Sequence, residues 1–243
     1  MRKPLVVVGA VVAAVALLGL GGAYAYYFSG LHTAPKPLAL STPTASSSAG
    51  VTPATASSAS LAGTWKVAQG SEAGYRVREQ FAGQNGAHEA VARTSSVSGT
   101  LTTQETSAGL EVSGLQVTVR VADLQSRDQV VGLDVSNRDR IVSRTLSVSQ
   151  YPDATFAAQG VAVPAGLTSG STVSVTIPGQ LTVHGVTRPE QAAVQLHLNG
   201  SQVQAVGSTN FLMTDFGVEP PQVPITVVQP QVTVEFQLVL ARG

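Results

Sequence analysis

Hydrophobic and polar residues alternate along most of the chain after Leu61, and this pattern restricts the fold more than any other feature of the sequence. In residues 115–121, 194–199 and 231–238, every second residue is Val, Leu or Phe, and the residues between them are polar or charged. Successive side chains of a β-strand point to opposite faces, so this period predicts strands with one apolar and one polar face. We expect further strands over residues 75–81, 97–103, 154–163, 171–177, 180–184 and 202–209.

Turn signals separate these segments and indicate a meander of antiparallel strands. Asn199-Gly200 lies between two alternating runs and predicts a tight hairpin. Residues 123–150 break the alternation, and we expect a short helix in this long connection. The sequence therefore predicts an all-β domain whose strands close into a barrel or fold into two facing sheets. A barrel of about eight strands has an interior that side chains fill or that holds one small ligand, and the alternation leaves both open.

The first 28 residues form a separate, apolar region. No charged side chain occurs between Leu5 and Phe28, and a helix of this length, about 36 Å, would cross a hydrocarbon core of about 30 Å. Arg2 and Lys3 precede the run, which places the N-terminus in the cytoplasm and the rest of the chain outside. Ala23-Tyr24-Ala25 resembles a cleavage site, so a removed signal peptide is the alternative. In both cases we expect the remaining chain to be exported.

Residues 29–60 are rich in Ala, Ser, Thr and Pro and contain few large apolar side chains. Such a segment buries too little apolar surface to offset the entropy that is lost when a chain is ordered. We therefore expect three parts. These are a transmembrane anchor or signal sequence over residues 1–28, a disordered linker over 29–60, and a β-barrel domain over 61–243.

The composition excludes several classes of protein. Without cysteine the chain has no disulfides, no thiolate catalysis and no Cys-ligated metal site. Lys and Arg together number 14, as do Asp and Glu, so no basic field favours nucleic acid. The histidines form no zinc-binding or hydrolase motif, and we expect neither a metal nor a catalytic residue. We interpret His88 with Glu89 as a solvated hairpin end and His184 as structural.

Several groups of residues resemble motifs of a known family. Residues 124–128 (LQSRD), 136–139 (SNRD) and 150–156 (QYPDATF) are similar to the Arg-Asp, Tyr-Pro and Phe core of the YceI-like proteins. Residues 179–189 (GQLTVHGVTRP) closely match that family's hairpin G-x-L-T-h-x-G-V-T-[KR], and residues 214–218 (TDFGV) resemble its late DFG turn. The order and spacing of these motifs agree over essentially the whole predicted barrel domain.

The resemblance implies a lipocalin-like antiparallel β-barrel, exported in bacteria, with a long apolar lumen that can hold a polyisoprenoid chain. Residues 140–146 (RIVSRTL) stand where the family more commonly has HLRS-x-DFF, which leaves open how the barrel mouth closes and which lipid fits. Gly63-Thr64-Trp65 resembles the start of a lipocalin, and Arg242 follows the last strand. An arginine stacked on this tryptophan would close one barrel end through a cation–π contact.

We expect the ligand to contact apolar side chains of the inner strand faces, where each buried methylene of the ligand would contribute about 0.8 kcal/mol. These candidate lumen residues are Phe81, Val117, Val119, Phe156, Leu181, Val183, Leu196, Phe211 and Phe236.

Arg127, Asp128, Arg138 and Asp139 form a near-repeat in the long connection. One interpretation places them at the barrel mouth, where they would orient the headgroup of a ligand. The other assigns them to helix capping and to salt bridges that fix the loop.

Together these features predict a non-catalytic protein that binds or carries an apolar chain, an isoprenoid lipid or quinone, outside the cytoplasm. We expect it to be a single-pass membrane protein, or a secreted one if the N-terminal segment is cleaved. The ligand and the membrane are its expected partners, and no cofactor is expected beyond a bound lipid or quinone. A tethered structural or stress-related interaction module with a filled core is the alternative, whereas an enzyme would need titratable groups that converge in the lumen.

Overall fold

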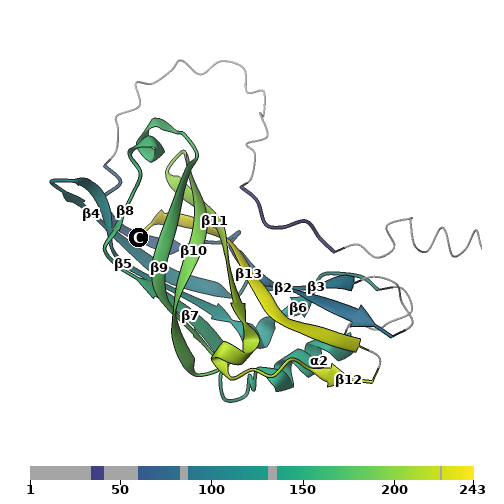
Figure 1. Cartoon of the computed structure of the whole chain (residues 1–243). Coiled ribbons are helices and arrows are strands. Elements are labelled where there is room, and N and C mark those ends of the chain that lie inside the picture. Colours follow the sequence, from purple (N-terminus) through teal and green to yellow (C-terminus); the bar gives the residue numbers. More distant parts are fainter. Residues whose placement is uncertain (1–33, 41–59, 83–86, 131–135, 225) are drawn as a thin grey trace, which may run out of the picture.

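A computed structural model describes residues 34–40, 60–82, 87–130, 136–224 and 226–243 of the chain (Figure 1). The described residues form thirteen strands in one antiparallel sheet, one α-helix and three short 3-10 helices. The strands are β1 (Gly63–Val67), β2 (Glu72–Phe81), β3 (Ala87–Thr94), β4 (Val97–Thr106), β5 (Gly109–Arg120), β6 (Gln125–Ser126), β7 (Asp153–Ala158), β8 (Val161–Ala162), β9 (Val173–Val183), β10 (Val186–Asn199), β11 (Gln202–Leu212), β12 (Gln222–Val223) and β13 (Thr226–Arg242). The helices are α2 (Ser136–Thr145), η1 (Val121–Asp123), η2 (Ala165–Ser169) and η3 (Met213–Phe216).

Eight strands close into a barrel in the order β1-β4-β5-β7-β9-β10-β11-β13, and β13 pairs back to β1. The closing pair includes Trp65 opposite Arg242. On the same edge β13 continues against β2, which pairs with β3. The prediction of an all-β antiparallel barrel with a short helix in the long connection is confirmed, and the two-sheet alternative is excluded.

The hairpin between β9 and β10 follows from the residues at its turn. His184 and Gly185 both have positive φ angles, 52° and 74°, as a two-residue turn that matches the twist of its strands requires. The His184 ring packs edge-on against Tyr151 at a centroid distance of 5.1 Å. The structural role expected for His184 agrees with this position.

One pair of predicted strands is a single strand in the structure. The segments 171–177 and 180–184 join into β9, although Pro178 lies in its middle. A proline lacks the N–H group that a central strand needs for its ladder. Strand β7 pairs with β9 only at residues 180–182, so Pro178 lies beyond the end of that ladder.

Residues 34–40 differ from the disordered linker expected over 29–60. They lie on the outer wall of the barrel, drawn in purple in Figure 1, and Leu38 donates its N–H to the Glu235 carboxylate. The physical reason is that polar groups of the barrel wall replace the apolar burial that this segment lacks. The predicted anchor over residues 1–28 lies outside the described residues, and within them no helix combines the length and apolar character needed to cross a membrane.

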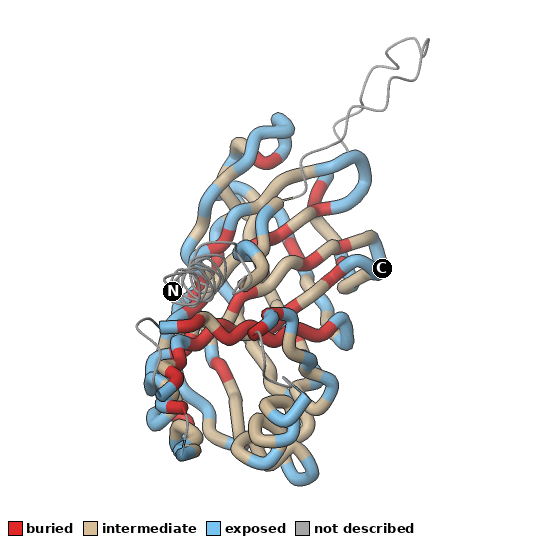
Figure 2. The backbone as a smooth tube through the Cα atoms, turned by 90° about the vertical axis from the view of Figure 1, so that its right-hand side faces the viewer, coloured by how far each residue is buried: buried red, intermediate tan, exposed pale blue. Residues whose placement is uncertain are grey.

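Buried residues alternate with exposed ones along most strands, but β2 and β3 are buried on both faces (Figure 2). Two apolar clusters lie toward opposite ends of the barrel. One surrounds Trp65, Leu167 and Leu240, and the other surrounds Phe216 and Leu181 near helix α2.

Candidate ligand-binding cavity

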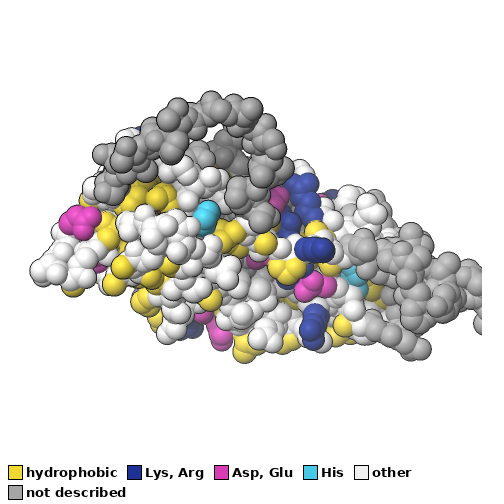
Figure 3. Space-filling view, turned by 90° about the horizontal axis from the view of Figure 1, so that it is seen from above, with side chains coloured by type: hydrophobic (Ala, Val, Ile, Leu, Met, Phe, Trp, Pro, Cys, Tyr) yellow, Lys and Arg dark blue, Asp and Glu magenta, His cyan; other side chains and the backbone are white. Residues whose placement is uncertain are grey.

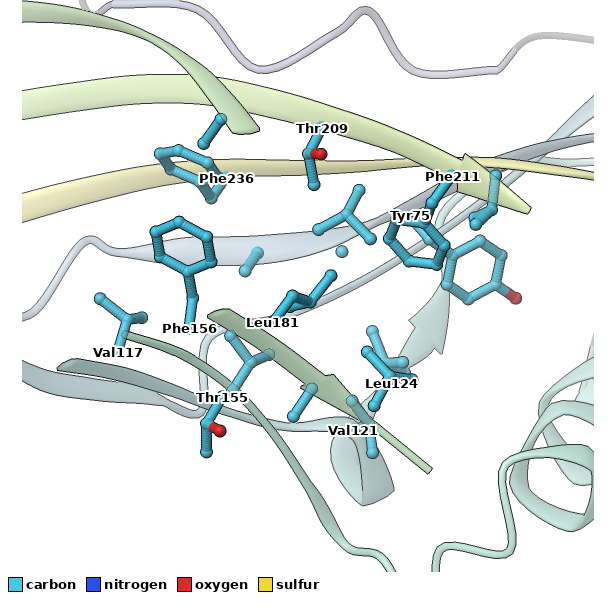
Figure 4. Close-up of a pocket in the computed structure, with 18 of the residues that line it drawn as sticks. Tyr75, Val117, Val121, Leu124, Thr155, Phe156, Leu181, Thr209, Phe211 and Phe236 are labelled. Atoms are coloured by element: carbon cyan, nitrogen blue, oxygen red, sulfur yellow. The ribbon is translucent and has the colours of Figure 1, made fainter. Parts of the chain in front are cut away.

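A cavity of about 490 Å³ lies inside the barrel and extends from Trp65 to helix α2. All eight barrel strands contribute to its lining, which is apolar over most of its surface. Figure 4 shows part of this lining, with Phe and Leu side chains directed into the interior. All nine candidate lumen residues line the cavity: Phe81 on β2, Val117 and Val119 on β5, Phe156 on β7, Leu181 and Val183 on β9, Leu196 on β10, Phe211 on β11 and Phe236 on β13.

Two phenylalanine rings lie against the wall because glycines make room for them. A Cβ atom on Gly179 would lie 2.4 Å from the Phe156 ring, and one on Gly207 would lie 2.6 Å from the Phe236 ring. Both distances are shorter than any stable contact. Figure 4 shows the rings of Phe156 and Phe236 facing each other across the lumen. The two glycines therefore keep the space between these rings open.

The end of the barrel opposite α2 is closed by Trp65 and Arg242. The Trp65 indole is 2 % exposed and donates its N–H to the Leu61 carbonyl at 3.1 Å. The Arg242 guanidinium carbon lies 4.6 Å from the centre of the Trp65 ring, and its Nη1 donates to the Ala62 carbonyl at 2.7 Å. The cation–π closure expected from the sequence is thus confirmed, and the cavity ends blindly here.

Replacing Arg242 with alanine should destabilise the closed end of the barrel modestly. The contact is partly exposed, and cation–π pairs at exposed sites contribute about 0.5–1 kcal/mol. We expect a decrease of about 1 kcal/mol in the free energy of unfolding, measured by urea denaturation with Trp65 fluorescence as the probe. Arg242→Lys is the control, because it keeps the cation, and it should lose less. Equal losses in both variants would contradict a cation–π role.

The end of the cavity near α2 carries a cluster of charged side chains that we call the mouth cluster: Glu79, His88, Asp128 and Arg138. Arg138 Nη1 donates to both Asp128 carboxylate oxygens at 2.7 Å, and its Nη2 donates to Glu79. His88 Nε2 lies 2.7 Å from Asp128 Oδ2, and the Val91 N–H donates to Asp128 Oδ1 at 3.0 Å. Glu79 and Arg138 line the cavity, whereas Asp128 is 2 % exposed behind them.

The surroundings of these carboxylates shift their pKa values in opposite directions. Burial raises the pKa of Glu79 above its ordinary value, and the nearby Arg138 only partly offsets this. Burial opposes ionisation of Asp128 as well, but hydrogen bonds from His88, Arg138 and Val91 hold the pKa of that carboxyl at about 2. The Asp128–Arg138 pair therefore stays ionised over the whole physiological range of pH.

Tyr75 contributes a further polar group to this end of the cavity. It lies on the same face of β2 as Glu79 and lines the cavity. Burial raises the pKa of its hydroxyl above the ordinary value, and the carboxylates of the mouth cluster act in the same direction. The hydroxyl stays protonated and can both donate and accept a hydrogen bond.

The four predicted mouth residues divide into two pairs. Asp128 and Arg138 meet in the mouth cluster, so the interpretation as polar groups at the end of the barrel fits them. Asp139 accepts hydrogen bonds from the N–H and the hydroxyl of Ser126 at 3.0 and 2.7 Å, which fixes the loop before α2. Arg127 has a side chain that is 44 % exposed and lies 4.0 Å from Glu72, so it contributes nothing to the cavity.

Two members of the mouth cluster were missed from the sequence. The interpretation of His88 as a solvated hairpin end is wrong, because His88 is 8 % exposed and bonded to Asp128. Glu79 falls on the inner row of β2 together with Tyr75 and Phe81, and it pairs directly with His88 across the ladder. A carboxylate at an inner position of an otherwise apolar row was the signal that could have identified the pair.

The mouth cluster also offers ligand atoms for a metal ion. One atom each from Glu79, His88 and Asp128 lies within 4.8 Å of the other two. The Arg138 guanidinium already lies among these atoms and donates to both carboxylates. Because a cation of the protein itself already occupies the position between the two carboxylates, the donor set does not fit a divalent metal.

A closed antiparallel barrel with an apolar lumen and a few polar groups at one end defines a class of small β-barrels that hold apolar ligands. Residues 65–240 match the model of the YceI-like domain. The chain therefore belongs to the YceI-like family, as its motifs suggested. Among curated proteins, no match was found.

Solved structures with this fold include a polyisoprenoid-binding domain from Saccharophagus degradans implicated in plant cell wall breakdown. That domain is 17 % identical, with a TM-score of 0.55 over 74 % of this chain and 98 % of its own. BcnA from Burkholderia cenocepacia is 20 % identical, with a TM-score of 0.45 over 68 % of this chain and 95 % of its own. The YceI protein of Campylobacter jejuni is 15 % identical, with a TM-score of 0.37 over 65 % and 83 %. At 17 % identity, the likeness to the Saccharophagus degradans domain is one of fold.

Proposed function

We propose that the chain binds and carries an apolar chain, an isoprenoid lipid or quinone, in the barrel lumen, and that no bond is made or broken. The observation that carries this proposal is the apolar cavity of about 490 Å³ between Trp65 and α2. Its volume falls within the range of small-molecule sites, about 300–1,000 Å³. The description of the Saccharophagus degradans domain as polyisoprenoid-binding supports the same ligand class.

The volume of the cavity sets the length of chain that it holds. At roughly 30 Å³ for a group the size of a water molecule, the cavity accommodates about 16 such groups. This corresponds to about three isoprene units. Because Trp65 and Arg242 close the other end, the remainder of a longer chain extends past α2.

The charges at the α2 end favour a ligand with a neutral head. Arg138 is bonded to two carboxylates, from Asp128 and Glu79, so its charge is already compensated. A phosphorylated head would meet this excess of negative charge and be repelled. A quinone carbonyl or a prenyl hydroxyl instead needs only one hydrogen-bonding partner, and the Tyr75 hydroxyl at the cavity wall suits that role.

The location that we propose is outside the cytoplasm, with the barrel attached to the membrane through residues 1–28. The uncharged run from Leu5 to Phe28, preceded by Arg2 and Lys3, supports this orientation. Determination of the N-terminal residue of the mature protein distinguishes an uncleaved anchor from a removed signal peptide. An N-terminus at or after Tyr26 would exclude the anchor.

Native mass spectrometry of the protein purified from its own membranes tests the binding function. We expect a mass increment from a bound lipid, which lipid extraction followed by fragmentation identifies as an isoprenoid. Delipidated protein should regain a quinone or a prenyl alcohol in preference to the corresponding prenyl phosphate. Protein that is repeatedly empty and takes up neither compound would overturn the proposal and favour a displayed scaffold.

A further inference from the structure

Three charged side chains on the outer wall are buried where a barrel normally exposes them. Arg76 on β2 and Glu235 on β13 point away from the lumen, since their neighbours in the strands line it. Arg93 on β3 lies on the same face as Glu235, because both are paired directly with Gly74 of β2. Arg76, Arg93 and Glu235 are nevertheless only 6 %, 9 % and 4 % exposed. Charged residues are almost never buried unless they are paired and covered, so some part of the chain must cover this wall.

The three side chains form one ion network. Arg76 Nε donates to one oxygen of Glu235 at 2.7 Å, and Arg93 Nε donates to the other at 2.8 Å. Arg93 reaches Glu235 across strand β2 at Gly74, where an added Cβ would lie 2.8 Å from the Arg93 Cγ. The missing side chain of Gly74 therefore allows an ion pair between strands that are not neighbours.

The cover is the segment of residues 34–40, which we call the strap. Arg76 Nη2 donates to the Pro35 carbonyl at 2.6 Å, and Arg93 Nη2 donates to the Lys36 carbonyl at 2.6 Å. In the reverse direction, the Leu38 N–H donates to Glu235 at 3.2 Å. The wall thus recognises the backbone of the strap with both donors and an acceptor, and the charged donors make these bonds stronger than neutral ones.

The strap continues from this network along an outer groove. Pro37 and Leu38 line the groove together with residues of β9, β10 and β11, including Val175, Gln195 and Val206. Figure 3 shows Lys and Arg side chains gathered in one part of the face that is seen from above. Arg76 and Glu235 also line the groove, so the strap runs from the ion network directly into it. The prolines at 35 and 37 favour the extended form that the strap adopts at little entropic cost.

The strap does not belong to the family domain, which matches residues 65–240. We propose that Arg76, Arg93 and Glu235 form a peptide-docking site on the outer wall, that its occupant is the chain's own strap, and that this docking holds the barrel close to the membrane. The docking site is inferred from the contacts described above. The further inference, that docking holds the barrel close to the membrane, rests on the proposed membrane anchor.

Docking changes the length of the tether. Without it, the 32 residues 29–60 would join the anchor to the barrel, and a random coil of that length has ends about 30 Å apart on average and reaches much further when extended. With the strap docked, residues 29–33 alone join the anchor to the barrel wall, and five residues span at most about 17 Å. A lipid carrier held at this distance stays within reach of its source.

A cysteine-free chain allows spin labels to be placed at chosen positions of the full-length protein. We choose Lys36→Cys in the strap and Gln116→Cys on β5, an exposed strand position on a part of the barrel that the strap does not contact. Pulsed electron spin resonance should give one narrow distance peak.

Leu38→Pro removes the N–H that binds Glu235, and we expect the narrow peak to be lost. Ala39→Pro introduces a proline at a neighbouring exposed residue, and the peak should persist.

A second measurement tests the position of the barrel. The protein carries a donor dye on Gln116→Cys alone and is placed in vesicles that contain acceptor-labelled lipid. Energy transfer from the dye to the bilayer should be less efficient in the Leu38→Pro variant than in the Ala39→Pro variant. A broad distance distribution in the unmodified strap would overturn the docking site. Equal energy transfer in the two proline variants would overturn the positional role. Failure to bind an isoprenoid changes neither readout, so the proposed ligand and the docking site are tested separately.

Discussion

A phenylalanine at position 192 is expected to abolish uptake of the apolar ligand while the barrel remains folded. Ala192 lies on β10, is 4 % exposed and lines the cavity, where it belongs to an apolar cluster with Val194 and Ala205. The added ring extends into the space that the ligand chain would occupy. Because that space is empty of protein atoms, the overpacking cost should stay near the lower end of the usual 1–3 kcal/mol. Native mass spectrometry and quinone uptake measure the loss.

The matched control for Ala192→Phe is Gln191→Phe. Gln191 precedes Ala192 on the same strand but is exposed on the outer face, so the same ring is added outside the lumen. We expect this variant to bind ligand as the unmodified protein does. If Ala192→Phe still takes up quinone while thermal unfolding shows an intact fold, the lumen is not the binding site. Ala192→Leu serves as an intermediate step, with partial loss expected.

The mouth cluster should make Asp128 one of the most sensitive positions for stability. The Asp128 side chain is fully buried and accepts hydrogen bonds from Arg138, His88 and Val91. Asp128→Asn removes one of the two carboxylates bonded to Arg138, and truncation of one partner of a buried ion pair costs about 3–5 kcal/mol. Urea denaturation should show this decrease in the free energy of unfolding. Asp139→Asn is the control, since the hydrogen bonds of that part-buried carboxylate among the described residues are with Ser126, and it should cost about 1 kcal/mol.

The effect of Asp128→Asn should depend on pH in a defined direction. The Asp128 pKa is about 2 in the folded protein, below the ordinary value of 3.8. A carboxyl whose pKa is lower in the folded than in the unfolded protein stabilises the fold at pH values above its pKa in the unfolded protein. This stabilisation is lost as the pH falls toward its pKa in the folded protein. The stability gap between the two proteins should therefore be complete above about pH 4 and shrink from pH 4 to pH 2.

Glu79 acts with the opposite sign. Its pKa is raised, so the folded state binds a proton more readily than the unfolded state and gains stability as the pH falls. The loss of stability between pH 4 and pH 2 that comes from protonation of Asp128 should accordingly be absent in Asp128→Asn and persist in Glu79→Gln. A gap between the unmodified protein and Asp128→Asn that is constant from pH 7 to pH 2 would contradict the role of the ionised Asp128.

The barrel could be predicted because its determinants are local. Alternation in β5, β10 and β13 defines which residues face inward, and Asn199-Gly200 defines one hairpin. Val117, Val119, Leu196 and Phe236 follow from this parity. The other five lumen residues lie on strands whose alternation is less regular. The closure of β13 onto β1 is different, because it depends on a register between the two ends of the domain, and the resemblance to the YceI-like family suggested it where alternation could not.

The full mouth cluster and the strap could not be predicted because both depend on contacts between distant segments. Asp128 and Arg138 are candidates for the mouth from the sequence, but His88 joins them only when β3 and the loop after β6 come together. The strap has the composition of a linker, and only the wall formed by Arg76, Arg93 and Glu235 gives it an ordered position. The relevant signal was a cluster of charges at outward positions of adjacent strands.

The pairing of the first barrel strand with the last one has a consequence for biosynthesis. Trp65 finds its partner only after Arg242 has been added, and at about 5–20 residues per second the ribosome needs roughly 10–35 seconds for the intervening chain. During this interval the apolar side chains of the inner strand faces cannot be buried, because the barrel is not yet closed. A nascent chain of this kind depends on chaperones or on prompt transfer out of the ribosome's vicinity, and truncation by even one strand should yield aggregates.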